Sequence, residues 1–499
     1  MRRAVTPAWP QHAVALRVLA GAFGCGSEVD LPTTAYRFPP VFSPDTYAAR
    51  RAALARTVGS GLVVILGHDD APMNYPANVY PFRQDGSFLY YGGHDAPGLA
   101  LAVDAETGRT TLYGHDPTLD DVVWEGPAPS LAERAERVGA DAHAAPAALA
   151  EAVAQARAAG RVAHTLPANR ASGRERLVEI AGDIRPSEVL VAAVVAQRLV
   201  KTVAEIAEME ASLGLAAEVH ALAMRGAQPG QTERGLTAAI EAHLASAGSY
   251  PSYPVILTRR GEVLHGHPTG AVLEAGDLLL VDAGAVSVGT RYASDLTRTM
   301  PVGGHFTSRQ RALYDVVLAA QLAAVEAMQP GVPFRDVHAV AARTITVGLA
   351  GLGLMRGDPD EAVAAGAHAL FFVHGLGHAI GLDVHDMEGL GEDAVGYGEG
   401  FLRSTQFGTR FLRFARPLRE GYVMTVEPGV YLVDALIDAW SADGRLAEFV
   451  DYAEVERWRG TGGIRIEDNV LVTESGHRVL GPSVPKTAEA VEAAVQAGA

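Results

Sequence analysis

The sequence predicts a two-domain α/β protein, and three observations lead to this prediction. The chain has 499 residues, more than one hydrophobic core ordinarily serves, so we expect two domains. Up to about residue 185, short apolar runs that are typical of strands alternate with helical patterns. Beyond that point, two pairs of similar segments occur in the same order, which predicts two related α/β halves.

The first domain is expected to span residues 36–186 and the second residues 187–486. Residues 1–35 are predicted to be an N-terminal extension and residues 487–499 a C-terminal tail. A signal peptide is the alternative for the extension, but Arg17 interrupts its apolar run and no clear cleavage site follows.

Hydrophobic patterns predict the elements of the first domain in order. A helix is expected before residue 60, because alanines and arginines stand there at helical spacing. Strands are expected at 62–66, 99–103 and 110–113, and helices at 130–138 and 146–159. The aromatic run FLYY at 88–91 is predicted to be a further strand. The stretch 187–225 is predicted to form one long helix or two.

An internal duplication is the most informative pattern of the second domain. Segments 223–240 and 327–345 share the motif QPG and an apolar helical pattern after it. GDLLLVDAG at 276–284 recurs as GYVMTVEPG at 421–429, with an acid six positions after the first glycine. We therefore predict two halves that are related by pseudo-symmetry.

Each half carries two acids on or beside a strand-like run: Asp282 and Asp295, then Glu427 and Glu467. One such acid by itself is more often a turn or surface residue, but the duplicated order favours a shared pocket. Four close carboxylates cannot all remain ionised without a cation, so the sequence predicts two divalent metal ions. Oxygen-rich ligation with a single imidazole favours ions such as Mn²⁺.

Three histidines lie in the stretch FFVHGLGHAIGLDVHDME, 371–388: His374, His378 and His385. The first two stand four apart, as in the helical zinc motif HExxH, but the glutamate is missing. The glycines between them each weaken a helix by about 1 kcal/mol. We therefore predict a strand-and-turn segment whose metal-binding partners lie elsewhere, with satisfied core histidines as the alternative.

The motifs VDAG, SDLTRT, HGLGHAIGLDVHD, TVEPGVY and GIRIEDN together resemble the pita-bread metallopeptidases prolidase and aminopeptidase P. The resemblance covers roughly residues 190–485, and YPFRQDGSFLYYGG resembles the N-terminal domain of creatinase and prolidase. It implies a creatinase/prolidase-like α/β domain followed by a pseudo-symmetric pita-bread (α+β) catalytic domain.

The resemblance also implies the metal ligands. Asp282 is expected to bind one ion and Asp295 to bridge both. His378 and Glu427 are expected to bind the other ion, with Glu467 as a second bridge. The two ions are expected to be Mn²⁺, with Co²⁺ or Zn²⁺ as alternatives, and Glu427 or Glu467 to move a proton.

Further catalytic positions follow from the same motifs. His265 matches the family's histidine upstream of the first acid, and His267 is a weaker candidate. His374 and His385 match histidines that contact the substrate, where either would stabilise an oxyanion. Arg465 matches an arginine that holds carboxylates in register.

The implied activity is hydrolysis of the bond before proline in a dipeptide or longer peptide. Arg413 resembles the prolidase arginine that binds a dipeptide's C-terminal carboxylate, which favours a dipeptidase over an aminopeptidase. A basic surface loop is the alternative for Arg413. Trp124 is expected to line the partner subunit's pocket in a homodimer or larger homo-oligomer, with a buried structural tryptophan as the alternative.

One spacing departs from the family: the step from Asp282 to Asp295 is two residues longer than usual. The additional residues are predicted to extend a hairpin turn at 287–289. A methionine aminopeptidase, a creatinase and a non-catalytic binding module are rivals. The large first domain disfavours the first, and the complete ligand set disfavours the other two. Incidental hydrolysis of phosphotriesters is a further alternative that the sequence does not decide.

The bulk composition bounds the partners and the location. A net charge of −17 disfavours nucleic acid and anionic membrane surfaces. No run of 18 uncharged apolar residues occurs, so no membrane span is predicted. The one cysteine, Cys25, excludes an intramolecular disulfide and favours the cytoplasm.

Overall fold

The computed structural model describes residues 42–182, 185–398 and 400–498. The predicted extension, residues 1–35, lies outside the described residues. Contacts divide the chain into a large unit of residues 37–116 and 129–499 and a small unit that includes residues 117–128. None of the described helices combines the length and the apolar character that crossing a membrane requires.

The described part of the small unit is a single short helix, α3 (Leu119–Glu125). It begins with a capping box in which the side chains of Thr118 and Asp121 bond each other's backbone N–H. No residue of α3 is buried, and Trp124 is 85% exposed.

The first domain of the large unit is built on one five-stranded sheet in the order β4-β3-β2-β1-β5. Its strands are β1 (Leu62–Leu66), β2 (Ala100–Asp104), β3 (Thr110–Tyr113), β4 (Ala142–Ala144) and β5 (Ala163–Thr165). The three central strands pair antiparallel, and each edge strand pairs parallel with its neighbour. The three strands predicted from apolar runs are confirmed, with the second displaced by one residue.

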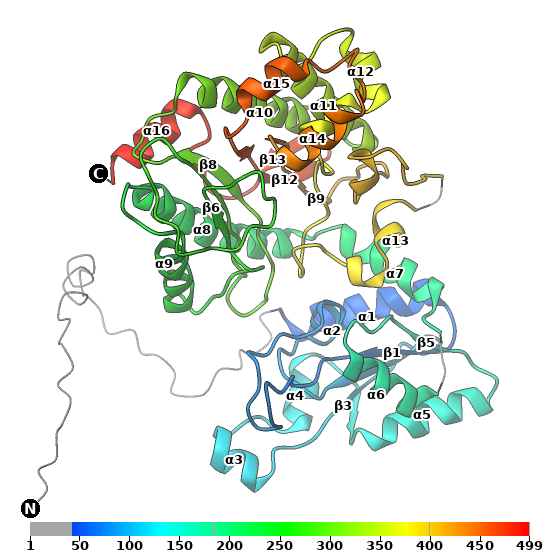
Figure 1. The fold of residues 1–499 in the computed structure, drawn as a ribbon. Coiled ribbons are helices and arrows are strands. Elements are labelled where there is room, and N and C mark those ends of the chain that lie inside the picture. Colours follow the sequence, from blue (N-terminus) through cyan, green and yellow to red (C-terminus); the bar gives the residue numbers. More distant parts are fainter. Residues whose placement is uncertain (1–41, 183–184, 399, 499) are drawn as a thin grey trace, which may run out of the picture. The chain divides into compact units, whose positions relative to one another are not determined.

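Helices cover both faces of this sheet (Figure 1). Successive side chains of a strand point to opposite faces, so the apolar runs need a covering layer on each side. Val63 and Ile65 of β1 pack with the residues of α1, α2 and α7, whereas Leu62 and Val64 face α5 and α6. The helices of this domain are α1 (Pro44–Val58), α2 (Gly86–Gly92), α4 (Leu131–Arg137), α5 (Ala147–Ala158) and α6 (Ala171–Ala181). Helix α7 (Glu188–Leu199), which was expected to begin the second domain, packs on α1. The predicted α/β domain is thus confirmed.

The run FLYY forms helix α2, so the predicted strand at 88–91 is wrong. Asp85 caps the start of the helix by accepting a hydrogen bond of 2.9 Å from Phe88 N–H. Gly93 ends it with φ 64°, a left-handed conformation that glycine adopts without strain. All seven residues are buried, so an apolar run without alternation marks a fully buried helix here rather than a strand.

The second domain consists of two halves with the same elements, which confirms the predicted duplication. The first half comprises α8 (Val203–Gly226), α9 (Glu233–Ser246), β6 (Ile256–Thr258), β7 (Leu278–Asp282) and β8 (Thr297–Pro301). The second comprises α10 (Ser308–Glu326), α11 (Phe334–Gly351), β9 (Val423–Val426), β12 (Asp468–Thr473) and β13 (Gly476–Val479). Each half thus pairs two long helices with a three-stranded antiparallel sheet.

The remaining elements of this domain lie mostly within the second half. They are α12 (Pro359–Ala365), η1 (Ala367–Leu370), η2 (Glu388–Leu390), α13 (Glu392–Gly396), η3 (Thr409–Phe411), β10 (Gly429–Tyr431), α14 (Asp434–Ala442), α15 (Tyr452–Trp458) and β11 (Gly463–Arg465). The segment predicted as a tail contains α16 (Ala488–Gln496), which packs on α8 and β8.

The two halves meet where their strands carry the acids. Asp282 ends β7 and Glu427 follows β9, while Asp295 and Glu467 lie just before β8 and β12. An isolated bridge joins Thr297 to Glu467 and links the two sheets at this point. The fold therefore places all four acids at one junction.

Candidate metal centre

The histidine segment 371–388 is irregular and runs beside β9, joined to it by one β-bridge, Ala379–Met424. Thr425 N–H donates to the His378 carbonyl over 2.9 Å, so the segment follows the strand without forming a regular one. A Cβ on Gly377 would overlap the carbonyl of Thr425. The glycine permits this close approach, and a helix is excluded, as the sequence predicts.

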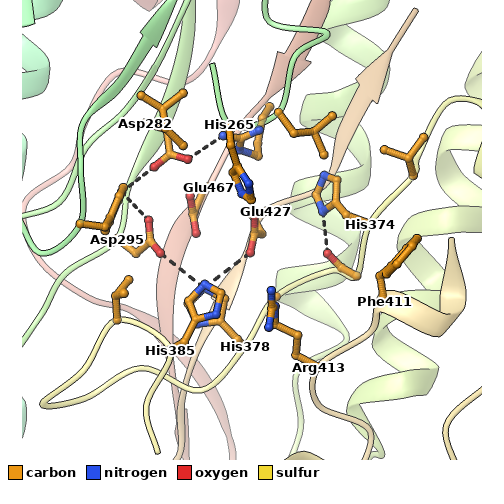
Figure 2. Close-up of a pocket in the computed structure, with 18 of the residues that line it drawn as sticks. His265, Asp282, Asp295, His374, His378, His385, Phe411, Arg413, Glu427 and Glu467 are labelled. Atoms are coloured by element: carbon orange, nitrogen blue, oxygen red, sulfur yellow. Dashed lines mark hydrogen bonds and ion pairs between the residues drawn. The ribbon is translucent and has the colours of Figure 1, made fainter. Parts of the chain in front are cut away.

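The four acids and the three histidines line one cavity of about 660 Å³. Ten of the predicted site residues are part of its wall: His265, Asp282, Asp295, His374, His378, His385, Arg413, Glu427, Arg465 and Glu467 (Figure 2). The predicted residues are brought together from both halves of the duplicated domain.

His378 faces two of the acids. Its Nε2 lies 3.4 Å from Asp295 Oδ2 and 3.7 Å from Glu427 Oε1 (Figure 2). Its Nδ1 lies 3.1 Å from the Ala379 carbonyl, which fixes that nitrogen as a donor and directs Nε2 to the acids. Burial would lower the pKa of His378, but the hydrogen bond to Asp295 and the charge of Glu427 raise it to about 9.

Tyr253 and Arg465 hold the acids of the first half. The Tyr253 hydroxyl lies 2.5 Å from Asp282 Oδ1 and 2.6 Å from Asp295 Oδ1. Arg465 Nη2 donates to Asp282 Oδ2 over 2.6 Å. This ion pair agrees with the predicted role of Arg465 in aligning carboxylates.

Asp295 and Glu467, the two acids that are predicted to bridge the metal ions, are each contacted by the opposite half. Thr297, two residues after Asp295, donates its hydroxyl to Glu467 Oε2 over 2.7 Å. Asn469, two residues after Glu467, bonds both the N–H and the carbonyl of Asp295, at 3.1 and 2.7 Å. The two halves therefore fix each other's acid.

The electrostatics of the cluster fit a bound cation. Burial raises the pKa of Asp282, Glu427 and Glu467, and Glu427 reaches about 7. Charges of the neighbouring acids add to this rise. Asp295 is the exception: burial would raise its pKa, but the hydrogen bond and charge of His378, together with the hydrogen bond of Tyr253 and the charge of His385, lower it.

Two further observations support the fit. Glu467 Oε1 is buried and has no hydrogen-bond partner within the described residues. Ligand atoms of Asp295, His378 and Glu467 lie within 4.8 Å of one another, close enough to hold a metal ion. The donor set therefore suits a metal ion that would satisfy the open oxygen and compensate the like charges.

His374 lies beside the acids but bonds elsewhere. Its Nδ1 lies 2.8 Å from the Gly375 carbonyl and its Nε2 2.8 Å from the Tyr431 hydroxyl. Tyr431 in turn accepts from Arg465 Nη1 over 3.0 Å. Burial, followed by the charge of Arg465, lowers the pKa of His374 to about 3, so the ring is neutral at neutral pH.

His385 stacks on His378 with ring centres 4.0 Å apart. Its Nδ1 lies 3.0 Å from Glu388 Oε2, and the same oxygen accepts from Arg413 Nη1 over 2.7 Å. The charge of His378, with burial, lowers the pKa of His385. Glu388 thus connects a candidate catalytic histidine with the candidate substrate arginine.

The weaker candidates have simpler surroundings. His265 and His267 lie on the loop after β6, both exposed at the cavity wall. Trp124 lies in the small unit, and its predicted role at a partner subunit stays a prediction. The alternative of a buried structural tryptophan is wrong, since the side chain is 85% exposed.

The hairpin between the first two acids closes with a bridge between Val286 and Ala293. Ser287 N–H donates to the Tyr292 carbonyl over 2.8 Å, so the predicted extra residues at 287–289 lie in the turn. Arg291 at this tip has φ 69°, and its guanidinium pairs with Asp95 of the first domain over 2.7 Å.

Buried ion pairs hold the segment that carries His385. Asp386, which is 1% exposed, pairs with Arg198 at 2.7 Å and with Lys201 at 3.0 Å. Arg198 lies on α7 and also donates to Ser87 of α2 over 2.9 Å. The histidine segment is therefore tied to the first domain through α7.

The sequence did not single out several of these partners. Tyr253 stands next to Pro254 in a loop-like stretch, and nothing in its spacing relates it to the acids. Thr297 and Tyr431 lie inside the motifs SDLTRT and TVEPGVY, so a closer study of those motifs could have identified them as site residues. Glu388 ends the histidine stretch three residues after His385, a spacing that suggests a contact.

Three buried carboxylates and the half-buried Glu427 around an imidazole, on a duplicated scaffold, define the class of protein: a metal-dependent hydrolase. Comparison with known proteins gives the family. Residues 207–474 match metallopeptidase family M24, and residues 47–163 match the N-terminal domain of aminopeptidase P. The chain belongs to family M24, in the branch of prolidase and aminopeptidase P, and is therefore a metal-dependent peptidase.

Relatives of both kinds are similar over most of the chain. The human Xaa-Pro dipeptidase is 33% identical over 461 residues, 87% of this chain and 89% of its own length. The Xaa-Pro aminopeptidase of Escherichia coli is 31% identical over 474 residues, 90% of this chain and 97% of its own.

Solved structures are similar in fold. A variant of Escherichia coli aminopeptidase P in complex with substrate matches with a TM-score of 0.76 and 29% identity, over 92% of this chain and 99% of that one. Aminopeptidase PepP of Pseudomonas aeruginosa matches with a TM-score of 0.74 and 28% identity, over the same shares. The predicted creatinase/prolidase-like α/β domain followed by a pita-bread catalytic domain is thus confirmed, and the matching model of the first domain is that of aminopeptidase P.

Proposed function

We propose that the protein is a prolidase, which hydrolyses the bond between any residue and proline in a dipeptide. The names of its relatives support cleavage before proline, and they are divided between dipeptidases and aminopeptidases. The choice between these two therefore depends on the cavity itself.

Arg413 is the observation that carries the choice of a dipeptidase. Its guanidinium lines the same cavity as the four acids, so a positive charge lies near the reacting bond. Among the described residues, only its Nη1 is hydrogen-bonded, to Glu388 and Glu392 at 2.7 and 3.2 Å. The other guanidinium nitrogens can therefore bind a carboxylate with two hydrogen bonds, which rewards a free C-terminus next to proline.

The proposed ligands of two metal ions are Asp282, Asp295, His378, Glu427 and Glu467. Mn²⁺ is the proposed ion, because the set is rich in oxygen and has one imidazole. When bound, two such ions would supply a water molecule activated at neutral pH and a Lewis acid for the substrate carbonyl. Tyr253 and Arg465 would keep the carboxylates oriented, and Glu427 is proposed to move the proton.

His385 is proposed as the first contact of the developing oxyanion. His374 already bonds through both ring nitrogens, whereas His385 bonds only through Nδ1 among the described residues. An oxyanion donor contributes about 2.7–4 kcal/mol to the transition state. His265 remains a proposed substrate contact at the cavity wall.

The test is to incubate the Mn²⁺-loaded protein with Ala-Pro and with Ala-Pro-Ala and to identify the products by mass spectrometry. We expect cleavage of Ala-Pro and little release of alanine from Ala-Pro-Ala. Alanine released from the tripeptide at the dipeptide's rate would instead make the protein an aminopeptidase P, the second candidate function.

The variant Arg413→Met tests whether this arginine binds the C-terminal carboxylate of the dipeptide. Losing a charge-assisted hydrogen bond costs about 1.5–3 kcal/mol, so the KM for Ala-Pro should rise roughly 10- to 100-fold. Arg309→Met is the matched control, because Arg309 stacks on Trp458 and neither residue is part of the cavity wall. Equal KM values for the two variants would exclude Arg413 as the carboxylate contact.

We also propose a cytoplasmic location, which the single cysteine supports, and a homodimer or larger homo-oligomer. The exposed Trp124 of α3 supports a subunit contact.

A further inference from the structure

His220 is a buried histidine that contacts the acid-bearing strands from behind the cavity. It lies on α8, is 0% exposed, and is not part of the cavity wall. Its Nε2 lies 3.1 Å from the carbonyl oxygen of Ala283 and 3.0 Å from that of Leu296. These two residues directly follow Asp282 and Asp295 in the sequence.

The imidazole of His220 is a hydrogen-bond donor here. Carbonyl oxygens only accept, so Nε2 carries the proton and shares it between both carbonyls. Nδ1 is buried without a hydrogen-bond partner in the described part of the chain. Burial and the charge of Arg298 lower the pKa of His220 to about 4, which keeps the ring neutral. One N–H thus joins the two segments that present the acids of the first half.

Gln321 occupies the matching position in the second half. The motif QPG at 228–230 and 329–331 relates the halves by a shift of 101 residues, which takes His220 to Gln321. Gln321 lies on α10 and is 0% exposed. Its amide Nε2 donates to Asp468 Oδ2 over 2.9 Å, and Asp468 directly follows Glu467.

The contact of Gln321 belongs to a buried group behind Glu467. Asp468 also accepts from Arg298 over 2.7 Å and from Lys486 over 2.8 Å. Arg298 donates in addition to the carbonyl of Glu467 over 2.6 Å. In both halves, therefore, one buried side chain of the first long helix holds the residue that follows the bridging acid.

We propose that His220 and Gln321 are a pair of positioning residues for the metal centre. His220 fixes the backbone directly after Asp282 and Asp295, and Gln321 holds the side chain of Asp468, the residue directly after Glu467. Metal–ligand distances tolerate only about 0.2 Å, so such a support acts directly on metal affinity. The inference rests on the proposed metal ligands and does not depend on the choice between dipeptidase and aminopeptidase.

The second half itself supplies the conservative substitution. His220→Gln places an amide N–H near the position of Nε2, as Gln321 does, and should preserve metal binding. His220→Leu is of similar size but leaves two buried carbonyls without that donor. Gln321→Met removes the second donor in the same way. His338→Leu is the control, because His338 is also buried, lies on α11 and has no hydrogen bond within the described residues.

The primary measurement is the Mn²⁺ dissociation constant of the full-length chain by equilibrium dialysis, with the melting temperature of the metal-free protein measured beside it. Loss of an outer support of a metal site typically weakens binding 10- to 100-fold. We expect this loss for His220→Leu and Gln321→Met, and values near wild type for His220→Gln and His338→Leu.

A purely structural role would give a different pattern. The melting temperature would then fall while the Mn²⁺ affinity of the folded variants stayed at the wild-type value, and the proposal would be overturned. It would also be overturned if His220→Gln lost as much affinity as His220→Leu. If His220→Leu does not fold, Gln321→Met decides by the same criterion. A wild-type chain that bound no Mn²⁺ would contradict the proposed function instead.

Discussion

Asp295 is the acid on which most contacts of the centre converge, since it meets His378, Tyr253 and Asn469. We predict that Asp295→Asn lowers both Mn²⁺ affinity and peptidase activity by more than the roughly 10- to 100-fold that an outer support costs. Dialysis and a dipeptide assay would measure the two losses. Asp315→Asn on the exposed side of α10 is the control and should change neither. Full activity of Asp295→Asn with metal bound would contradict the proposed ligand set.

Protonation of the same cluster predicts how stability depends on pH. The pKa of Glu427 is raised from 4.5 to about 7 and that of His378 from 6.5 to about 9 in the metal-free protein. The folded protein therefore binds these protons more tightly than the unfolded chain, so its free energy of unfolding falls as pH rises between about 4.5 and 9.

Mn²⁺ replaces these protons, so its stabilising effect should grow over the same pH range. We expect the difference in melting temperature between Mn²⁺-loaded and metal-free protein to increase between about pH 5.5 and about pH 8.5. Differential scanning calorimetry with and without a chelator measures it. Glu427→Gln should flatten the pH dependence of the metal-free protein. A difference that stayed constant with pH would show that proton release is not linked to metal binding.

The acids could be predicted because they occur twice in the sequence in the same order, and the histidines because they are clustered in one short stretch. Their supports could not. Tyr253, His220 and Gln321 reach the site from loops and helices that only the tertiary fold brings near it. A polar residue inside an apolar helix pattern gives no indication of which carbonyl it will meet.

Helix α7 carries much of the link between the first domain and the histidine segment. We predict that Asp386→Asn lowers the free energy of unfolding by about 3–5 kcal/mol, because it leaves Arg198 and Lys201 buried beside a neutral group. Urea unfolding measures this loss. Asp360→Asn breaks an exposed pair with Arg343 and should cost less than about 1 kcal/mol. Similar losses in the two variants would contradict this assignment.

Among the elements, the pattern predicted best the short apolar runs that turns bound, and it failed for the buried run that forms a helix. β1 and β3 match their predicted ranges, since apolar runs bounded by turns leave few alternatives. α2 was mistaken for a strand because its seven buried residues show no period. The segment 371–388 follows β9 without regular pairing. Its closely spaced glycines indicate that it is not a helix, but they do not indicate which strand it follows.

One continuous hydrophobic core runs through the large unit, from Leu54 and Val63 of the first domain to Leu471 of the second. We therefore predict that both domains unfold in one transition and that Mn²⁺ shifts the whole of it. At a free Mn²⁺ concentration 100 times the dissociation constant, the gain is about 2.7 kcal/mol. Hydrogen exchange should show the gain at β1 as well as at β7. Two separate transitions, with only the second shifted by metal, would contradict this.

The crossed contacts of Thr297 with Glu467 and of Asn469 with Asp295 make the site a joint product of two sequence copies. In each copy, one contact to the acid that is predicted to bridge comes from the other copy. A chain with a single copy would make such contacts only as a pair of identical molecules around a twofold axis. Fusion into one polypeptide removes that dependence on concentration and lets the copies diverge. The histidine in one helix and the glutamine in the other are a visible trace of that divergence.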